Sequence, residues 1–268
     1  MSANQATIKI KKDSGYAPVN GLNMYYEIHG EGSLLVLIHG GGSTIQTSFS
    51  RLLPLFAEHY KVIAIELQAH GHTSDRDSAE SFEQDADDVA ALLQYLKIEK
   101  AHILGFSNGG STAIQIAVRH PELVNKIVPV SVFYKREGMI TGFWDGMQQA
   151  SIDNMPALLK TYYLQIPGNN QQGLQRMFER DKQRMLQFKD WDDEVLRSIK
   201  APTLLIVADH DVMTTGHAVK MSQLIPDCQL MILPGVHGSF IGEVCTAEEG
   251  SKMPEATAMM IKEFLDKK

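Results

Sequence analysis

Hydrophobic residues in this chain form short continuous runs that alternate with longer amphipathic segments. A continuous apolar run such as 34–38 predicts a strand that is buried on both faces of a sheet. Further mostly apolar segments, each predicted to be a strand, lie at 61–65, 101–104, 126–132, 203–208 and 229–233. The clearest helix follows Ser81, with apolar positions three and four residues apart at Phe82, Ala86, Val89, Leu92 and Leu96. This alternation predicts an α/β fold, a mainly parallel sheet with helices on both faces.

Local signals predict three further elements. Asn20-Gly21 divides the segment 16–29 into two β segments and predicts a tight hairpin. The segments 47–59 and 254–265 are compatible with helices. At the start of the clearest helix, Ser81 is expected to cap the first turn and Gln84 to return a bond as its capping-box partner.

The alternating pattern breaks between 133 and 200, where helix-like pieces rich in Met, Gln and aromatic residues replace the strands. We therefore expect a flexible N-terminal tail at 1–15, a core formed by 16–132 and 201–268, and a helical cap inserted at 133–200. The cap's Met and aromatic side chains fit two interpretations. They form packed core, or they line a flexible apolar pocket to which unbranched Met adapts.

Charge and composition exclude several classes of partner. The net charge is −7, from 25 basic and 32 acidic residues, and no block of Lys or Arg predicts a nucleic-acid or anionic-membrane surface. No apolar run reaches the roughly 20 residues of a membrane span, and residues 1–13 lack the apolar core of a signal peptide. A cytoplasmic protein acting on a small molecule is expected, of unknown oligomeric state.

Neither a cofactor nor a metal is predicted. The glycine-rich stretches at Gly41-Gly42 and Gly109-Gly110 lack the lysine of a phosphate-binding loop. His70 and His72 share one loop without a third ligand, so ordinary loop polarity explains them better than a metal site. His39 is expected to bond neighbouring loops.

The strongest chemical signal is Gly105-Phe-Ser107-Asn-Gly109, placed between a predicted strand and a predicted helix. A serine at such a sharp turn needs glycines two residues before and after it, because side chains there would collide with neighbouring backbone. The turn predicts a nucleophilic hydroxyl held above the sheet, beside the N-terminal amides of the helix.

Partners for this serine follow two later strands. Asp209-His-Asp211 comes after the strand ending at residue 208, and His237 follows the one ending at 233. The order Ser, Asp, His is that of a triad at the carboxyl edge of an α/β sheet. Of the two acids, Asp211 lies further beyond the strand end and can reach sideways to the histidine. Backbone amides of Asn108 and Gly41 are the predicted oxyanion hole, with Gly42 a further candidate.

With these motifs the chain resembles the α/β-hydrolase superfamily, in particular its smaller capped esterases and lactonases. The resemblance runs from about Tyr16 to the C-terminus and rests on four segments: His39-Gly-Gly-Gly42, Gly105-Phe-Ser-Asn-Gly109, Ala208-Asp-His-Asp211 and Gly235-Val-His237. It implies eight strands with only the second antiparallel, a lid between strands six and seven, and Ser107, His237 and Asp211 as nucleophile, base and acid. The chain departs from the family at Glu66-Leu-Gln-Ala-His-Gly-His-Thr73 and at Ala208.

The leading hypothesis is hydrolysis of a small carboxylic ester or lactone. The same triad is also compatible with cofactor-free perhydrolysis or with cleavage of a carbon–carbon bond next to a carbonyl, because the cap selects the substrate. A third hypothesis, of another class, is a small-molecule receptor with little turnover. A dehalogenase is disfavoured because it needs an aspartate where this chain has Ser107. The predicted substrate contacts are Phe106, Phe143, Trp144 and Met213.

Overall fold

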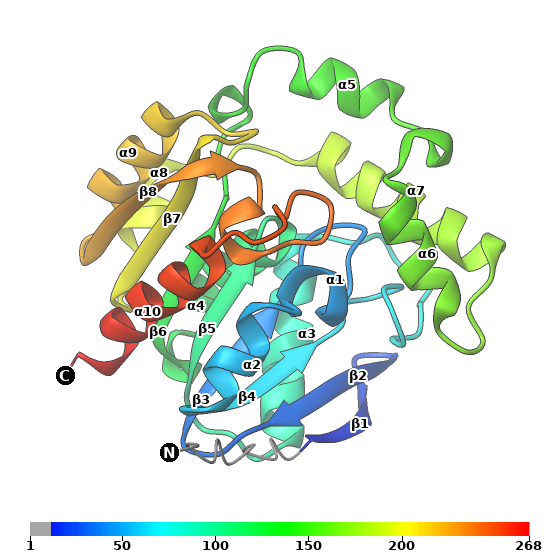
Figure 1. The fold of residues 1–268 in the computed structure, drawn as a ribbon, viewed down its shortest axis with the longest axis horizontal. Helices are drawn as coiled ribbons and strands as arrows, with labels where there is room; N and C mark the ends of the chain where they lie inside the picture. Colours follow the sequence, from blue (N-terminus) through cyan, green and yellow to red (C-terminus); the bar gives the residue numbers. More distant parts are fainter. Residues whose placement is uncertain (1–11, 268) are drawn as a thin grey trace, which may run out of the picture.

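The computed structural model describes residues 12–267, which are organised around one eight-stranded sheet (Figure 1). The order of strands across the sheet is β1-β2-β4-β3-β5-β6-β7-β8. Only β2 runs against the others, since it pairs antiparallel with both β1 and β4 while the remaining neighbours are parallel. The strands are β1 (Lys12–Val19), β2 (Leu22–His29), β3 (Ser33–Ile38), β4 (Tyr60–Ile65), β5 (Ala101–Phe106), β6 (Val124–Val130), β7 (Thr203–His210) and β8 (Cys228–Val236).

Helices cover both faces of this sheet, which confirms the predicted fold class. One layer contains α3 (Phe82–Tyr95), α4 (Asn108–Arg119) and α9 (Thr215–Leu224), together with the short η1 (Pro121–Leu123). The opposite layer contains α1 (Ile45–Phe49), α2 (Leu52–Ala57), η4 (Ser239–Ile241) and α10 (Met253–Asp266). Strand β3 shows why its sequence is continuously apolar: Val36 and Ile38 face the first layer, and Leu35 and Leu37 the second.

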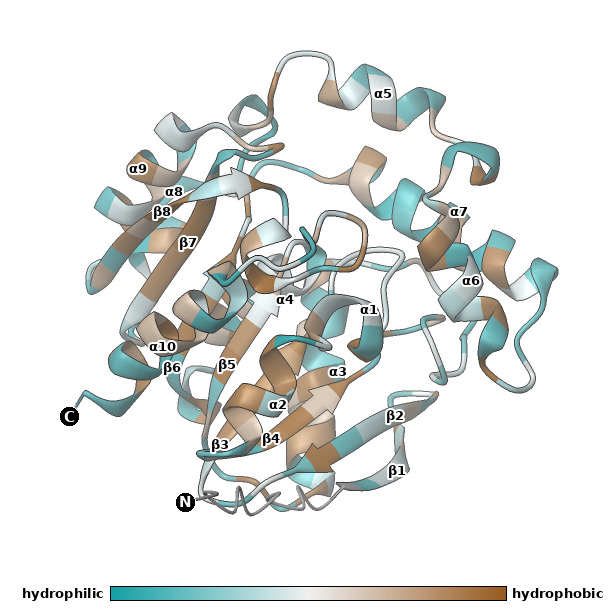
Figure 2. Ribbon diagram, viewed as in Figure 1, coloured by the Kyte–Doolittle hydropathy of each residue, from teal (hydrophilic) through white to brown (hydrophobic). Residues whose placement is uncertain are grey.

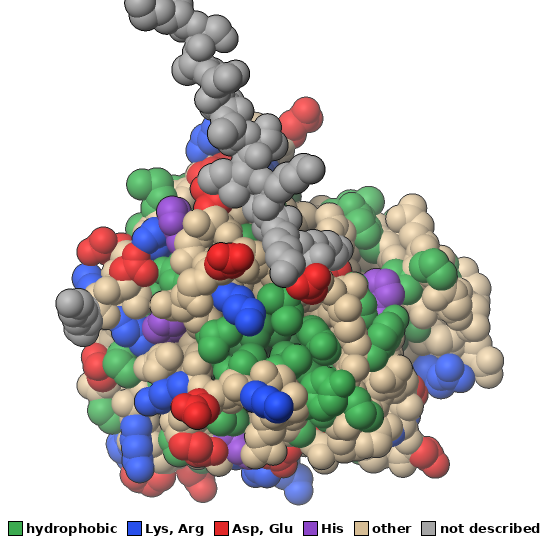
Figure 3. Space-filling view, turned by 90° about the horizontal axis from the view of Figure 1, so that it is seen from below, with side chains coloured by type: hydrophobic (Ala, Val, Ile, Leu, Met, Phe, Trp, Pro, Cys, Tyr) green, Lys and Arg blue, Asp and Glu red, His purple; other side chains and the backbone are tan. Residues whose placement is uncertain are grey.

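The same distribution is visible when residues are coloured by hydropathy, with the central strands hydrophobic and the outer helix surfaces mixed (Figure 2). The face seen from below carries Lys and Arg side chains interspersed with Asp and Glu, and they do not gather into one basic area (Figure 3). Among the described residues no helix combines the length and apolarity that a membrane span requires.

Between β6 and β7 the chain forms only helical elements: η2 (Arg136–Gly138), α5 (Phe143–Gln149), η3 (Ile152–Asn154), α6 (Ala157–Gln165), α7 (Gln171–Gln187) and α8 (Asp193–Arg197). Helices α5, α6 and α7 lie beyond the carboxyl ends of the strands (Figure 1). By contrast, α8 packs against α4 and α9, so the segment 133–200 includes one helix of the core layer. The division of the chain into a core and a separate cap stays a prediction.

Three local predictions need correction. Strand β1 begins at Lys12 and pairs with β2 along its whole length, so 12–15 do not belong to a tail; residues 1–11 lie outside the described part. The single helix expected at 47–59 is divided into α1 and α2, because Pro54 has no N–H to continue the ladder. Ser81 caps α3 as expected, but Gln84 donates to Asp88 and does not return the capping-box bond.

Candidate active site

Ser107 occupies a sharp turn between the end of β5 and the start of α4. Its backbone has φ of +54°, an unfavourable value for a residue with a side chain. Neighbouring glycines make the turn possible. A Cβ on Gly105 would lie 2.0 Å from the carbonyl oxygen of Gly109, and one on Gly109 would lie 2.3 Å from that of Ile38. Tight packing of the turn against β3 therefore holds the serine in its strained conformation.

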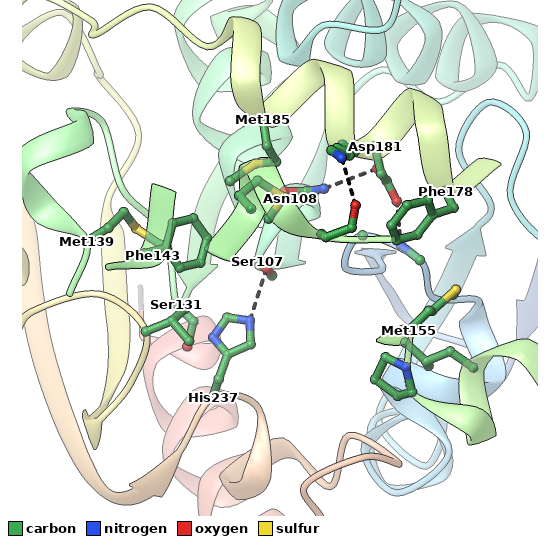
Figure 4. A pocket seen from close by; sticks show the side chains of 18 of the residues that line it. Ser107, Asn108, Ser131, Met139, Phe143, Met155, Phe178, Asp181, Met185 and His237 are labelled. Atoms are coloured by element: carbon green, nitrogen blue, oxygen red, sulfur yellow. Dashed lines mark hydrogen bonds between the residues drawn. The ribbon is translucent and has the colours of Figure 1, made fainter. Parts of the chain in front are cut away.

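The structure brings Ser107, His237 and Asp211 into one hydrogen-bonded line. The Oγ of Ser107 lies 3.1 Å from Nε2 of His237, and Nδ1 of His237 lies 2.6 Å from Oδ1 of Asp211. Figure 4 shows the serine and histidine facing each other at the cavity. With the Nδ1 hydrogen donated to the carboxylate, Nε2 is free to accept the serine proton. These residues meet because β5, β6, β7 and β8 are successive neighbours in the sheet.

Asp211 is buried and fully hydrogen-bonded. Besides the histidine, its carboxylate accepts bonds from Ser131 Oγ at 2.5 Å and from the amides of Ala208 and Val212 at 3.2 and 2.8 Å. Burial alone would raise the pKa of the Asp211 carboxyl, but the bonds from His237 and Ser131 outweigh it and lower the pKa. Ser131 can be recognised in the sequence as a polar residue directly after the end of β6.

Asp209, the alternative acid, has a different partner. It is exposed, and its Oδ1 accepts the backbone amide of Gly235 at 2.9 Å. This bond joins the ends of β7 and β8. Asp209 thus shapes the turn that carries Asp211, while Asp211 contacts the histidine.

Two backbone amides beside Ser107 are available for a ligand. Within residues 12–267, the N–H groups of Gly41 and Asn108 have no acceptor. The amide of Gly42 is different, because it donates to the Asp181 carboxylate at 2.5 Å. Gly42 is therefore occupied and does not serve as the further oxyanion donor that the sequence suggested.

A cavity of about 350 Å³ opens above Ser107 and His237 (Figure 4). Its wall is mostly apolar and comes largely from the segment between β6 and β7. Methionine and phenylalanine dominate this part of the wall: Met139, Phe143, Met147, Met155, Phe178 and Met185. Of the four predicted substrate contacts, Phe143 and Met213 line the cavity.

The other two predicted contacts, Phe106 and Trp144, lie outside the cavity lining, so that prediction does not hold for this cavity. Phe106 is buried beside the His237 ring, with ring centroids 4.8 Å apart. Trp144 turns away because its ring lies 3.7 Å from the Arg136 guanidinium and its Nε1 donates to the Arg136 carbonyl. The cap therefore satisfies both interpretations of its composition, since some of its Met and aromatic residues line the cavity and others form core.

A buried charged cluster borders the cavity opposite His237, and sequence reasoning missed it. We call Asp181, Arg184, His70 and Asp85 the cap–core cluster, since α7 supplies the first two and the core supplies the others. His70 faces acceptors with both ring nitrogens, the Gln68 carbonyl at 2.7 Å and Asp181 at 2.8 Å. Burial would lower the pKa of His70, but the Asp181 carboxylate outweighs it and raises the pKa to about 9. His70 is thus a charged member of this cluster.

The remaining loop histidines have separate partners. His72 Nδ1 lies 2.8 Å from the Glu66 carboxylate, whereas His70 contacts the Asp181 carboxylate. His39 accepts the Leu67 amide at 3.0 Å and faces the Gly40 carbonyl at 2.7 Å. Burial lowers the pKa of His39 to about 3, so it stays neutral and joins the two loops. Over residues 12–267, no three His, Cys, Asp or Glu side chains form a group able to hold a metal.

Comparisons with known proteins agree with this architecture. A family model of the alpha/beta hydrolase fold matches residues 33–163. Over 136 residues the chain is 35% identical to the dihydrolipoyllysine-residue acetyltransferase component of the acetoin cleaving system of Cupriavidus necator, covering 50% of this chain and only 36% of that protein.

Two further matches extend over most of the chain. It is 25% identical to the 2-hydroxy-6-oxo-6-(2'-aminophenyl)hexa-2,4-dienoic acid hydrolase of Metapseudomonas resinovorans, covering 85% of this chain and 86% of that one. Among solved structures, the enol-lactonase from Burkholderia xenovorans LB400 superposes with a TM-score of 0.72 at 22% identity, covering 94% of this chain and all of the enol-lactonase (100%).

Proposed function

The chain belongs to the alpha/beta hydrolase superfamily, and we propose that it is a serine hydrolase of a small carboxylic ester or lactone. One observation carries the proposal. A hydrogen-bonded Ser107–His237–Asp211 line lies at an apolar cavity, and the free amides of Gly41 and Asn108 lie beside it. A nucleophile, a base and oxyanion donors together are what acyl transfer requires.

The proposed reaction has two halves. In the first, Ser107 Oγ attacks the carbonyl carbon as His237 Nε2 takes its proton, and the amides of Gly41 and Asn108 stabilise the oxyanion. His237 then protonates the leaving alkoxide, which leaves an acyl-enzyme. In the second half, His237 deprotonates a water molecule that attacks the acyl carbon, and the proton returns to Ser107. Asp211 keeps its charge throughout and stabilises the imidazolium.

The cavity wall supports a small uncharged acyl group. Its volume of about 350 Å³ is at the small end of ligand pockets, and its flexible methionines fit varied apolar shapes. The Asp181 carboxylate also forms part of the wall. A negative group there disfavours a substrate that carries its own carboxylate near the scissile bond.

Carbon–carbon bond hydrolysis remains the second candidate, because a relative that matches over most of its length is named as a dienoic acid hydrolase. Its substrate is an acid, however, and Asp181 faces the cavity where such a carboxylate would need a cation. Lys182 also lines the cavity, where its ammonium donates to the Ala150 carbonyl at 2.7 Å and keeps its positive charge. We favour the ester or lactone reaction because the cavity wall is otherwise mostly apolar and because Asp181 adds a negative group to it.

The test is a turnover screen over p-nitrophenyl esters of graded acyl length, several lactones and one dienoate, with Ser107→Ala as the control. We expect turnover of at least one short neutral ester or lactone, and its loss in Ser107→Ala. Turnover restricted to the dienoate would favour carbon–carbon hydrolysis. Tight binding without turnover of any compound would contradict the proposal and favour the receptor hypothesis.

A further inference from the structure

The Asp181 side chain has four hydrogen-bonding partners beside the cavity, although its position on α7 requires none of them. Its Oδ2 accepts from the Gly42 amide at 2.5 Å and faces His70 Nε2 at 2.8 Å. Its Oδ1 accepts from the Asn108 side-chain amide at 3.2 Å and from Arg184. Figure 4 shows the bond between Asn108 and Asp181 above and to the right of Ser107. One carboxylate from α7 thus reaches three separate loops of the core.

Two of these loops carry the amides proposed to bind the oxyanion. Gly42 directly follows Gly41, and Asn108 offers its side chain to Asp181 while its own backbone N–H remains free. The two loops also touch, because a Cβ on Gly41 would lie 2.4 Å from Asn108 Nδ2 and 3.2 Å from Asp181 Oδ2. Asp181 therefore bonds each loop next to the loop's free backbone N–H group, and it lies at the contact between the two loops.

Two basic side chains, Arg184 and His70, hold the Asp181 carboxylate in place. Arg184, one turn further along α7, bonds Asp181 and also donates to Asp85 of α3 at 2.6 Å. His70 adds a second positive charge. Burial alone would raise the pKa of Asp181, but His70 and Arg184 together hold it well below its ordinary value, so the acceptor stays ionised. A charged acceptor makes the stronger hydrogen bonds to backbone N–H groups.

We propose that Asp181 is a positioning residue of the active site, which holds the Gly41–Gly42 turn and Asn108 so that their free amides point at the developing oxyanion. The inference rests on the proposed hydrolase function. It gives the cap a role in the chemical step, since the acceptor that fixes the core's donors is delivered by α7. Packing of α7 against the core would therefore also align the oxyanion hole.

A purely structural role for Asp181 predicts something different. As an anchor between cap and core, its loss would lower thermal stability and leave the turnover rate of the folded protein unchanged. As a positioning residue, its loss lowers kcat with little change in KM, because the oxyanion exists only in the transition state. The two roles also differ in their effect on inhibitors that form a tetrahedral adduct with the serine.

The experiment compares Asp181→Asn and Asp181→Glu with Glu179→Gln, which changes an exposed acid on the same helix. We expect kcat of Asp181→Asn to fall about 100-fold, the size of effect seen when an oxyanion donor is removed, with KM within about threefold of wild type. Asp181→Glu keeps the negative charge beside His70 and Arg184 but moves it by one methylene, so it remains folded if Asp181→Asn does not. Its kcat is expected to fall about tenfold.

An alkyl boronic acid provides the second readout, because it binds as a tetrahedral anion. Its inhibition constant is expected to rise in each variant by the same factor as kcat falls, while Glu179→Gln matches wild type in both. If kcat of a folded Asp181 variant stays within threefold of wild type or rises, the inference is wrong. Loss of kcat without weaker boronate binding overturns it too. Failure of the proposed function has a separate signature, since wild type itself would then neither turn over esters nor bind the boronate.

Discussion

The side of the cavity that carries Ser107 and His237 and the side that carries Asp181 are built in different ways. On the first, each residue follows the end of a parallel strand, so backbone geometry alone delivers it to the sheet edge. On the second, Asp181 lies in the middle of α7 and is held by the charges of Arg184 on the same helix and of His70 in a core loop. The first side is fixed by hydrogen-bonded backbone, and the second by a buried ionic cluster.

The difference has a functional consequence. Substitutions at the strand ends are expected to change the rate and leave the fold intact, because the backbone that positions them remains. Substitutions in the cap–core cluster are expected to change stability as well, because removing one partner leaves another charge buried and unpaired. Four predictions test this contrast, in order of decreasing effect.

The largest effect is expected from Asp211→Asn. The amide keeps the size of the side chain but presents the wrong partner to His237, which costs on the order of 10⁴-fold in kcat in the serine-protease precedent. Asp209→Asn is the matched control, since among residues 12–267 its carboxylate bonds only the turn at Gly235. Steady-state kinetics and melting curves on both variants give the answer. A larger loss in Asp209→Asn would reverse our assignment of the acid.

On the other side of the cavity, His70 is expected to make stability pH-dependent. Its pKa is raised from 6.5 to about 9 in the folded protein, so its contribution is fully present below pH 6.5 and disappears as pH rises through 9. The shift corresponds to about 3 kcal/mol. The difference in unfolding free energy between wild type and His70→Gln, measured in urea, should shrink between pH 7.5 and 10. His59→Gln, which changes an exposed histidine, is the control, and a constant difference for His70→Gln would contradict the charged state.

Ser131 tests whether the strand-end side depends on side-chain support at all. Removing its hydroxyl leaves Asp211 with two backbone amides and the histidine. Ser131→Ala is therefore expected to lower kcat about tenfold, the range of one hydrogen bond to a charged group. Ser111→Ala removes a buried hydroxyl that has no partner within residues 12–267 and should leave kcat unchanged. Equal rates for Ser131→Ala and wild type would show that the amides suffice.

The smallest effect concerns two adjacent cap residues. Phe143 lines the cavity, whereas Trp144 stacks on Arg136 outside it. Phe143→Ala should change the ratio of kcat/KM between short and long acyl esters by up to about tenfold, the scale of a lost apolar contact. Trp144→Ala should lower the melting temperature and leave that ratio unchanged. If Trp144→Ala changes the ratio more, the cavity wall differs from the one described.

The same contrast explains which features could be predicted from the sequence. The Asn20-Gly21 hairpin and the Ser107 turn depend on residues within a few positions, where glycine and positive φ leave a direct signal. The fold class followed from the alternation of buried strands and amphipathic helices. Asp211 and His237 could be located because the ends of the strands can be predicted from the sequence, and because the carboxyl ends of parallel strands meet at one edge of the sheet.

Asp181 carried no comparable signal. It is 139 residues from Gly42 and 111 from His70, and its position in α7 looks like any polar helix residue. The sequence also could not predict which of Phe143 and Trp144 faces the cavity. The two are adjacent aromatic residues on one short helix, and their orientations depend on tertiary contacts. Arg136 contacts the Trp144 ring and accepts its Nε1–H, which holds Trp144 outside the cavity. This contact forms only when the chain folds.

Labelling with a fluorophosphonate measures directly whether Ser107 is a nucleophile activated by His237, as proposed. Intact mass spectrometry of the treated protein should show one adduct per chain, and peptide mapping should locate it on Ser107. Ser107→Ala should not be labelled, and His237→Gln should be labelled far more slowly. An adduct on another residue, or none in the folded wild type, would contradict the account.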